Sequence, residues 1–300
     1  MKKYITNLFI VCLLFSGLGF TSCSEDDLSS TSVIVDSQKE ENEFDRWIQE
    51  NYVTPYNIDF KYRMEDIESD MNYYLVPAEY SKSIQMAKLM KFLCLEAYDE
   101  ITGTKDFIRS YYPKMIHLVG SAAYRNNGTM VLGTAEGGLK ITMYYINDLI
   151  LEPEYLNHYY FKTMHHEFGH ILNQTKPYTP DFDMISGNKY VTDSWNTTYK
   201  DGPDDPDPTA CLRDGFISPY AASGAGEDFV ELLSIYVTSS PKTWNAKMSA
   251  AGESGLQILQ SKFDIVYNYM LNSWDIDLDK LRDIIQRRQS ELPTLDLDNL

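Results

Sequence analysis

Residues 162–174 read KTMHHEFGHILNQ, and this stretch constrains the fold more than any other part of the chain. Proline is tolerated in the first turn of a helix, so Pro153 predicts a helix start, and Pro177 predicts an end before it. The sequence therefore predicts one long helix over residues 154–174, with HEFGH well inside it.

Two histidines and a glutamate on this helix have the spacing of a metal-dependent hydrolytic site. Residues four apart project from the same face of a helix, so His166 and His170 can converge on one metal ion. Glu167 is offset enough to miss the metal yet reach a water bound to it. Gly169 costs roughly 0.5–1 kcal/mol in a helix interior, which indicates that another element passes close to the backbone there. The same letters also occur by chance in ordinary helices, so the motif alone leaves both interpretations open.

The positions of the histidines restrict the third ligand. The five histidines stand at 117, 158, 165, 166 and 170, so none follows His170. The extended HExxHxxGxxH pattern would need glycine at 173 and histidine at 176, where this chain has Asn173 and Lys176. A third ligand further along the chain must therefore be a carboxylate.

Glu227 and Glu231 are the carboxylates that a later helix offers. EDFVELLSIYV predicts a helix over 227–237, on which the two glutamates share one face. The large apolar residues around them predict a buried segment, where two unpaired carboxylates would be costly. Only one of the two can ligate comfortably, and the other can hydrogen-bond a ligating histidine. A solvated acidic helix edge is the alternative.

These motifs resemble those of a known family. HHEFGH, a later tyrosine and, seven positions after it, the first glutamate of an E-x-F-x-E helix are similar to the zinc-peptidase domain of anthrax lethal factor and its gluzincin relatives. The resemblance implies two catalytic residues, Glu167 as general base and Tyr220 as stabiliser of the oxyanion. The ligands of Zn²⁺ that it implies are His166, His170 and Glu227.

The same resemblance implies a fold. We expect a zincin-like metallopeptidase fold of the α+β class, with a small mixed sheet, an HExxH active-site helix, Glu231 beside a ligating histidine, and a helical C-terminal part. In such folds an edge strand above the zinc pairs with an extended peptide, and LKITMYYI at 139–146 is our candidate for it. The other predicted elements are strands at 115–124 and 129–134, and helices at 81–103, 242–250, 254–273 and 277–291.

The N-terminus carries the features of an export signal. Two lysines precede an apolar run that is too short for a membrane-spanning helix, and FTSC resembles the lipobox of bacterial lipoproteins. An N-terminal core helix is the alternative. We predict a signal peptide over 1–22, lipidation of Cys23 and a flexible polar tether over 23–42. A metallopeptidase domain then follows at 43–300, with an N-terminal part at 43–176 and a C-terminal part at 177–300.

The whole chain also resembles zinc metallohydrolase lipoproteins associated with TonB-dependent substrate import. This resemblance implies a lipid anchor in an outer membrane, exposure at the cell surface and an import complex as a candidate partner. Cys94 and Cys211 are the other cysteines of the mature chain. Cys94 lies in an apolar helical pattern, where we expect a buried free thiol, and a single disulfide between the two cysteines is the alternative.

The charge of the chain limits its partners. There are 26 Lys and Arg residues against 44 Asp and Glu residues, a net charge of −18. This balance repels nucleic acid and anionic lipid, so neither is expected as a partner through charge alone. A neutral or cationic substrate, a peptide or a glycan remains open.

These patterns together predict a zinc-dependent metallopeptidase of the gluzincin type that hydrolyses peptide bonds. One alternative is a substrate-binding surface lipoprotein of a nutrient-import system with little turnover. Glu167 favours an enzyme over this alternative, because a pure binder needs no general base. A zinc hydrolase acting on a non-peptide amide is the other alternative, because such a metal site activates water whatever the substrate.

Overall fold

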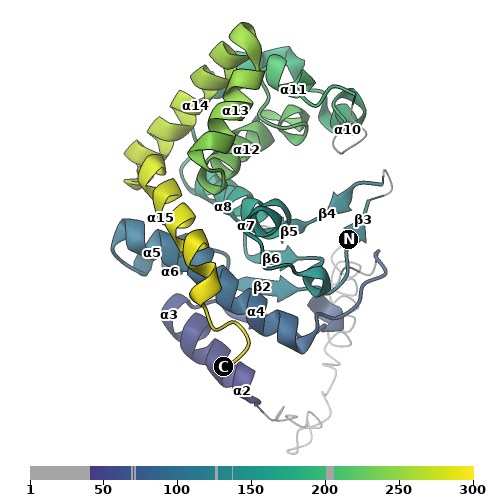
Figure 1. Ribbon diagram of the computed structural model, residues 1–300, viewed down its shortest axis with the longest axis vertical. Coiled ribbons are helices and arrows are strands. Elements are labelled where there is room, and N and C mark those ends of the chain that lie inside the picture. Colours follow the sequence, from purple (N-terminus) through teal and green to yellow (C-terminus); the bar gives the residue numbers. More distant parts are fainter. Residues whose placement is uncertain (1–40, 69, 71, 126–127, 137, 201–205) are drawn as a thin grey trace, which may run out of the picture. The chain divides into compact units, whose positions relative to one another are not determined.

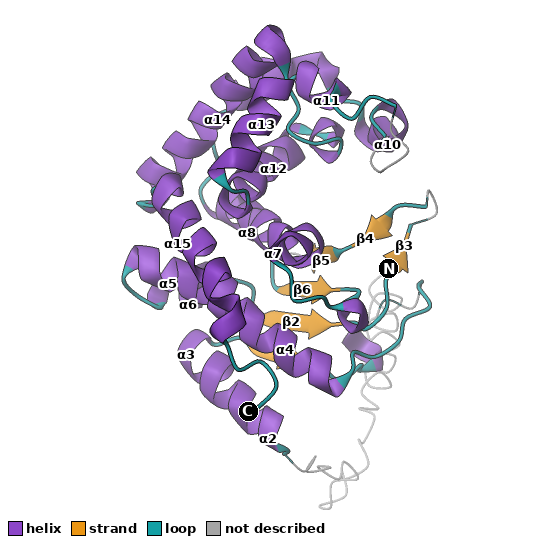
Figure 2. Cartoon of the chain, viewed as in Figure 1, coloured by secondary structure: helices purple, strands orange, loops and turns teal. Residues whose placement is uncertain are grey.

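The computed structural model describes residues 41–300 except 69, 71, 126–127, 137 and 201–205 (Figure 1). The predicted signal peptide, Cys23 and nearly all of the predicted tether lie outside the described residues. In the described part, many helices accompany a small mixed sheet, which confirms the α+β prediction (Figure 2). No helix among these residues combines the length and the apolar character needed to span a bilayer.

The described part begins with a capped helix, α2 (Glu43–Ile48). The Asn42 side chain accepts a hydrogen bond from the Asp45 amide at 2.8 Å, and Asp45 accepts one from the Asn42 amide at 2.9 Å. Such a reciprocal cap satisfies two amides that a helix start leaves unpaired. A π-helical turn (Gln49–Val53) and α3 (Thr54–Tyr56) continue this segment.

The helix predicted at 81–103 is confirmed, with a π-helical turn in its middle. It consists of α4 (Tyr80–Met90), the turn Lys91–Leu95 and α5 (Glu96–Thr102). Gly103 ends it with a φ of 70°, a left-handed conformation that glycine adopts without steric cost. A short helix, α6 (Asp106–Tyr111), follows.

Four short strands form the sheet, in the order β1-β2-β6-β5. β1, β2 and β6 are parallel, and β5 is antiparallel to β6. Their bounds are β1 (Asp59–Lys61), β2 (Met115–Leu118), β5 (Gly133–Glu136) and β6 (Lys140–Met143).

The strands predicted at 115–124 and 129–134 are each divided in two. Beyond β2 the chain forms β3 (Ala123–Tyr124), which pairs with β4 (Met130–Val131) in a separate antiparallel hairpin before β5 begins. The division between β2 and β3 lies at Gly120, whose backbone is so close to Pro77 that a Cβ there would be 2.2 Å from the Pro77 carbonyl oxygen. The chain turns at this close contact instead of extending β2.

The prediction that 139–146 forms the edge strand is wrong. This segment contains β6, which is paired with β2 on one side and β5 on the other. The strands at the two ends of the sheet are β1 and β5, and β5 is the one that lines the cavity beside α8. Ile141 and Met143 of β6 are fully buried, as expected for an interior strand.

The helix predicted at 154–174 is confirmed in position and contains HEFGH. It consists of α7 (Pro153–Leu156), a π-helical turn (Asn157–Phe161) and α8 (Lys162–Thr175). Figure 1 shows α8 between the sheet and the C-terminal helices.

Helix α12 (Ala225–Thr238), predicted at 227–237, packs against α8. The two helices approach closely at Gly169, where a Cβ would lie 2.9 Å from Cγ1 of Val230 and 3.1 Å from Cδ2 of Leu233. The close approach predicted from this glycine is therefore confirmed.

Short helices precede α12, and three long ones follow it. The short ones are α9 (Asp181–Ser186), α10 (Trp195–Thr198) and α11 (Ala210–Arg213). The later helices are confirmed as α13 (Pro241–Ala250), α14 (Gly252–Trp274) and α15 (Leu278–Glu291). Cys94 and Cys211 are buried and unbridged, which confirms the expectation of a buried free thiol at Cys94.

Candidate metal centre

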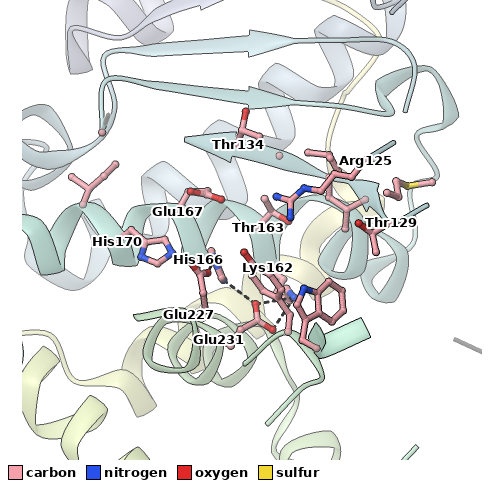
Figure 3. Close-up of a pocket in the computed structure, with 18 of the residues that line it drawn as sticks. Arg125, Thr129, Thr134, Lys162, Thr163, His166, Glu167, His170, Glu227 and Glu231 are labelled. Carbon is pink, nitrogen blue, oxygen red and sulfur yellow. Dashed lines mark hydrogen bonds and ion pairs between the residues drawn. The ribbon is translucent and has the colours of Figure 1, made fainter. Parts of the chain in front are cut away.

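Two histidines of α8 and one glutamate of α12 converge on one point (Figure 3). The ring centroids of His166 and His170 are 4.9 Å apart. Their Nε2 atoms lie 3.0 Å and 3.2 Å from the same oxygen, Oε2 of Glu227. The three side chains each offer one ligand atom, and these atoms all lie within 4.8 Å of one another.

This group fits zinc in donor chemistry and in spacing. Imidazole nitrogen and carboxylate oxygen are ligands that zinc binds at about 2.0–2.1 Å, so tetrahedral ligand atoms lie about 3.3 Å apart. The two distances from Glu227 Oε2, 3.0 Å and 3.2 Å, are close to that separation. Three protein ligands leave the fourth tetrahedral position open, as catalytic zinc sites require.

Glu231 contacts the opposite nitrogen of His166. Its Oε1 lies 2.8 Å from His166 Nδ1, and the carboxylate is fully buried. The Ser218 hydroxyl donates to Oε2 at 2.6 Å, and Lys162 Nζ lies 3.0 Å from Oε1. Burial raises the pKa of Glu231, but Lys162, His166 and Ser218 together lower it well below its usual range. Glu231 is thus an anion that fixes the orientation of the His166 ring.

The surroundings of His166 stabilise positive charge. Burial by itself lowers the pKa of His166, but the hydrogen bonds to Glu227 and Glu231 outweigh burial and raise it to about 9. Burial raises the pKa of Glu227, but His166 and His170 lower it well below its usual range. A point where carboxylates converge on two imidazoles in this way is suited to a cation.

Glu167 and Tyr220 lie in the same cavity as the three ligand candidates. Figure 3 shows Glu167 on the side of α8 that faces β5, away from Glu227. Tyr220 begins a 3₁₀ turn (Tyr220–Ser223) directly before α12, and its ring centroid lies 5.9 Å from that of His166. Burial raises the pKa of Tyr220 most, and the negative charge of Glu227 raises it further. The hydroxyl therefore keeps its proton at neutral pH and can donate a hydrogen bond.

The cavity has a volume of about 500 Å³ and is lined by several residues that the sequence did not single out, among them Arg125, Lys162, Thr163 and Trp195. Lys162 and Thr163 precede His166 by four and three positions, so helical spacing could have found them. Arg125 and Trp195 come from segments distant in sequence, and no spacing rule connects them to the motif.

The remaining three histidines do not belong to the candidate metal centre. His165 is next to His166 in the chain but lies fully buried on another side of α8, with Nδ1 3.0 Å from the Tyr98 hydroxyl. His117 is buried in β2, and His158 is exposed in the π-helical turn before α8.

Residues 37–279 match the family described as "Putative zinc-binding metallo-peptidase". The chain belongs to this family. A protein of the same description from Bacteroides caccae, whose crystal structure was solved at 2.10 Å resolution, is 47% identical to it with a TM-score of 0.74. This similarity covers 89% of the present chain and 99% of the solved one. No curated protein matches the chain. The zinc binding that describes the family agrees with the His–His–Glu group found in the described residues.

Proposed function

We propose that the protein is a zinc-dependent metallopeptidase of the gluzincin type, with His166, His170 and Glu227 as the zinc ligands. The observation that carries this proposal is the convergence of both Nε2 atoms on one oxygen of Glu227. A further support is Glu231, which is hydrogen-bonded to His166 on the side away from the proposed metal. Membership of the family supports both the metal and the peptidase class.

The side chains around the ligands suit hydrolysis of an amide. Bound zinc lowers the pKa of a coordinated water to about 7 and polarises a carbonyl group. In the proposed mechanism Glu167 accepts the proton of the attacking water and delivers it to the departing amine. The protonated hydroxyl of Tyr220 donates a hydrogen bond to the developing oxyanion. Glu231 accepts the Nδ1 proton of His166, which leaves Nε2 as the nitrogen for the metal.

We propose that the substrate lies along β5 as an extended segment. β5 is the last strand of the described sheet, and its residues Gly133 and Thr134 line the cavity above α8. A peptide that adds a strand to such an edge gains main-chain hydrogen bonds and aligns one carbonyl with the site. This role replaces the one that the sequence assigned to 139–146.

The test of the peptidase proposal is digestion of a mixed peptide library by the zinc-loaded protein and its Glu167→Gln variant. The variant should keep zinc, because the side chain is not a proposed ligand and hardly changes in size. Its cleavage rate should fall by ~10²–10⁴-fold, the usual effect of losing a general acid–base group. If the zinc-loaded parent cleaves no peptide, the peptidase proposal fails. The surface binder or the hydrolase of a non-peptide amide is then the better account.

We also propose that residues 1–22 are a signal peptide, that Cys23 is lipidated, and that the protein is anchored in an outer membrane at the cell surface. A TonB-dependent import complex is the proposed partner. The support for export and lipidation is the sequence of the N-terminal segment, with its lysines, apolar run and FTSC, and the support for the partner is the resemblance of the whole chain to lipoproteins of such import systems. Incorporation of a radioactive fatty acid should occur in the parent and be lost in Cys23→Ala. Equal label in both proteins would contradict lipidation at this residue.

A further inference from the structure

We propose that Arg125 makes the site selective for substrates that carry a carboxylate close to the scissile bond. The inference rests on the proposed peptidase function and concerns substrate class, which the zinc ligands and catalytic residues do not determine. The carboxylate is either an Asp or Glu side chain or the free C-terminus of a peptide.

The β3–β4 hairpin holds Arg125 at the cavity. Ala123 pairs with Val131, and the Arg125 amide donates to the Thr129 carbonyl at 3.0 Å. Ala123 and Val131 are buried in a small apolar cluster with Val119. The backbone of Arg125 is therefore positioned by packing and strand pairing, while its side chain is exposed.

The Arg125 guanidinium is available to a ligand. Figure 3 shows it extending between β5, at Thr134, and α8, at Thr163. It makes no hydrogen bond or ion pair with any other residue that the structure describes. Lys162 also lines the cavity, but its ammonium is already committed to the buried carboxylate of Glu231.

The charges around the cavity leave Arg125 without a counterion. With zinc bound, the carboxylates of Glu227 and Glu167 balance the two charges of the metal. Lys162 balances Glu231. Among the charged side chains that line the described cavity, the charge of Arg125 is then the one that nothing offsets. With zinc bound, the cavity therefore carries a net positive charge although the chain as a whole carries −18, and a carboxylate on the substrate completes the balance.

Arginine also has the geometry for this task. Its planar guanidinium can donate two parallel hydrogen bonds to one carboxylate, which a neutral amide cannot match. Arg125 lies towards the end of α8 that carries Thr163, not the end that carries His170 (Figure 3). We therefore expect the preference for a carboxylate on one side of the scissile bond only.

The experiment starts from a peptide that the zinc-loaded parent cleaves. Versions with Glu or Gln at each position, each with a free or an amidated C-terminus, are compared by kcat/KM. The parent should prefer the carboxylate at one location, and the pattern tells whether a side chain or the C-terminus is recognised. Arg125→Gln should reduce this preference by about tenfold. Arg125→Glu should reverse it, so that a further version of the peptide with Lys at the preferred position is cleaved better than the Glu version. Arg109→Gln, which removes an exposed arginine of α6, is the matched control and should keep the parental preference.

Two results would overturn the inference. One is a parent without any carboxylate preference, and the other is an Arg125→Gln variant with the parental preference. A loss of the same size on every peptide leaves the preference unchanged, so it counts against selectivity. Binding of the same peptides to zinc-loaded Glu167→Gln, measured by calorimetry, gives the preference without turnover. A parent that cleaves nothing contradicts the peptidase proposal. Calorimetry on matched Glu and Gln peptides drawn from the mixed library then decides the role of Arg125 without any turnover.

Discussion

His165 and His166 are neighbours in the chain, yet α8 gives them opposite surroundings. His165 packs against the ring of Tyr98, which itself packs against Phe168, and burial lowers the pKa of His165 to about 3. His166 faces two carboxylates of α12, which overcome burial and raise its pKa to about 9. The difference between these two histidines arises from α12, whose carboxylates make the position of His166, and not that of His165, suitable for a cation.

The two sides of α8 should therefore respond differently to substitution. On the carboxylate side, changes should alter zinc binding and turnover while the fold remains. On the aromatic side and at the contact with α12, changes should alter stability while zinc binding remains. Four substitutions, taken from the largest expected effect to the smallest, distinguish the two sides of α8.

Tyr220→Phe should reduce turnover by about 10²–10³-fold, because one hydrogen-bond donor to the oxyanion is lost. Zinc content should stay at the parental level, because the hydroxyl is not a proposed ligand. The measurement is kcat on a cleaved peptide, with elemental analysis of the same sample. Parental turnover in this variant would remove Tyr220 from the chemistry and leave Glu167 as the proposed catalytic group of the site.

Glu231→Gln should weaken zinc affinity by about 10–100-fold, the usual effect of removing a hydrogen-bond partner of a ligating histidine. The Nδ1 atom of His166 then loses its anionic acceptor. Competition with a chelator of known affinity measures the change. Glu253→Gln, an exposed glutamate at the start of α14, is the control and should bind zinc like the parent. An affinity in Glu231→Gln equal to that of this control would contradict the role of Glu231.

His165 should make the fold sensitive to acid. Its folded pKa of about 3 lies below that of an unfolded histidine, so the unfolded chain binds more protons as the pH falls below about 6.5. The free energy of unfolding should drop by about 2 kcal/mol between about pH 7.5 and about pH 5 through this residue. His165→Gln should lack this part of the drop, when both proteins are compared without metal by urea denaturation. Identical pH dependence would contradict the burial of a neutral His165.

Gly169→Ala should destabilise the fold by about 1 kcal/mol. The added methyl collides with Val230 and Leu233, and the better helix propensity of alanine offsets part of that cost. Thermal unfolding and zinc content measure the two effects separately. A variant more stable than the parent would show that α8 and α12 move apart enough to accommodate the added methyl group at little cost.

The sequence predicted the long helices well because their signals are local. Pro153 and Pro177 bracket the HEFGH helix, and Gly169 correctly indicated a close neighbour. The prediction that residues 139–146 form the edge strand failed for a different reason. LKITMYYI is rich in strand-forming residues because β6 is interior and buried, whereas GTAE in β5, the edge strand beside the cavity, has few strand-forming residues.

Part of the candidate site could also be read from spacing, but not all of it. The HEFGH histidines lie four apart on one helix, so their convergence needs no tertiary information. Glu227 and Glu231 share a helix face, and only the packing of α12 on α8 distinguishes the carboxylate at Nε2 from the one at Nδ1. Arg125 reaches the cavity through a hairpin far from the motif, and that placement depends on the whole fold.

The most direct test of the proposed zinc site is zinc content, measured on the parent, Glu227→Ala and Glu231→Gln in parallel. The arrangement of α8 and α12 predicts one zinc per parent chain and sharply weaker retention in Glu227→Ala. Glu231→Gln should still fill its site when zinc is supplied in excess. Full zinc content in Glu227→Ala, together with loss of zinc in Glu231→Gln, would contradict the proposed ligand set and make Glu231 the third ligand.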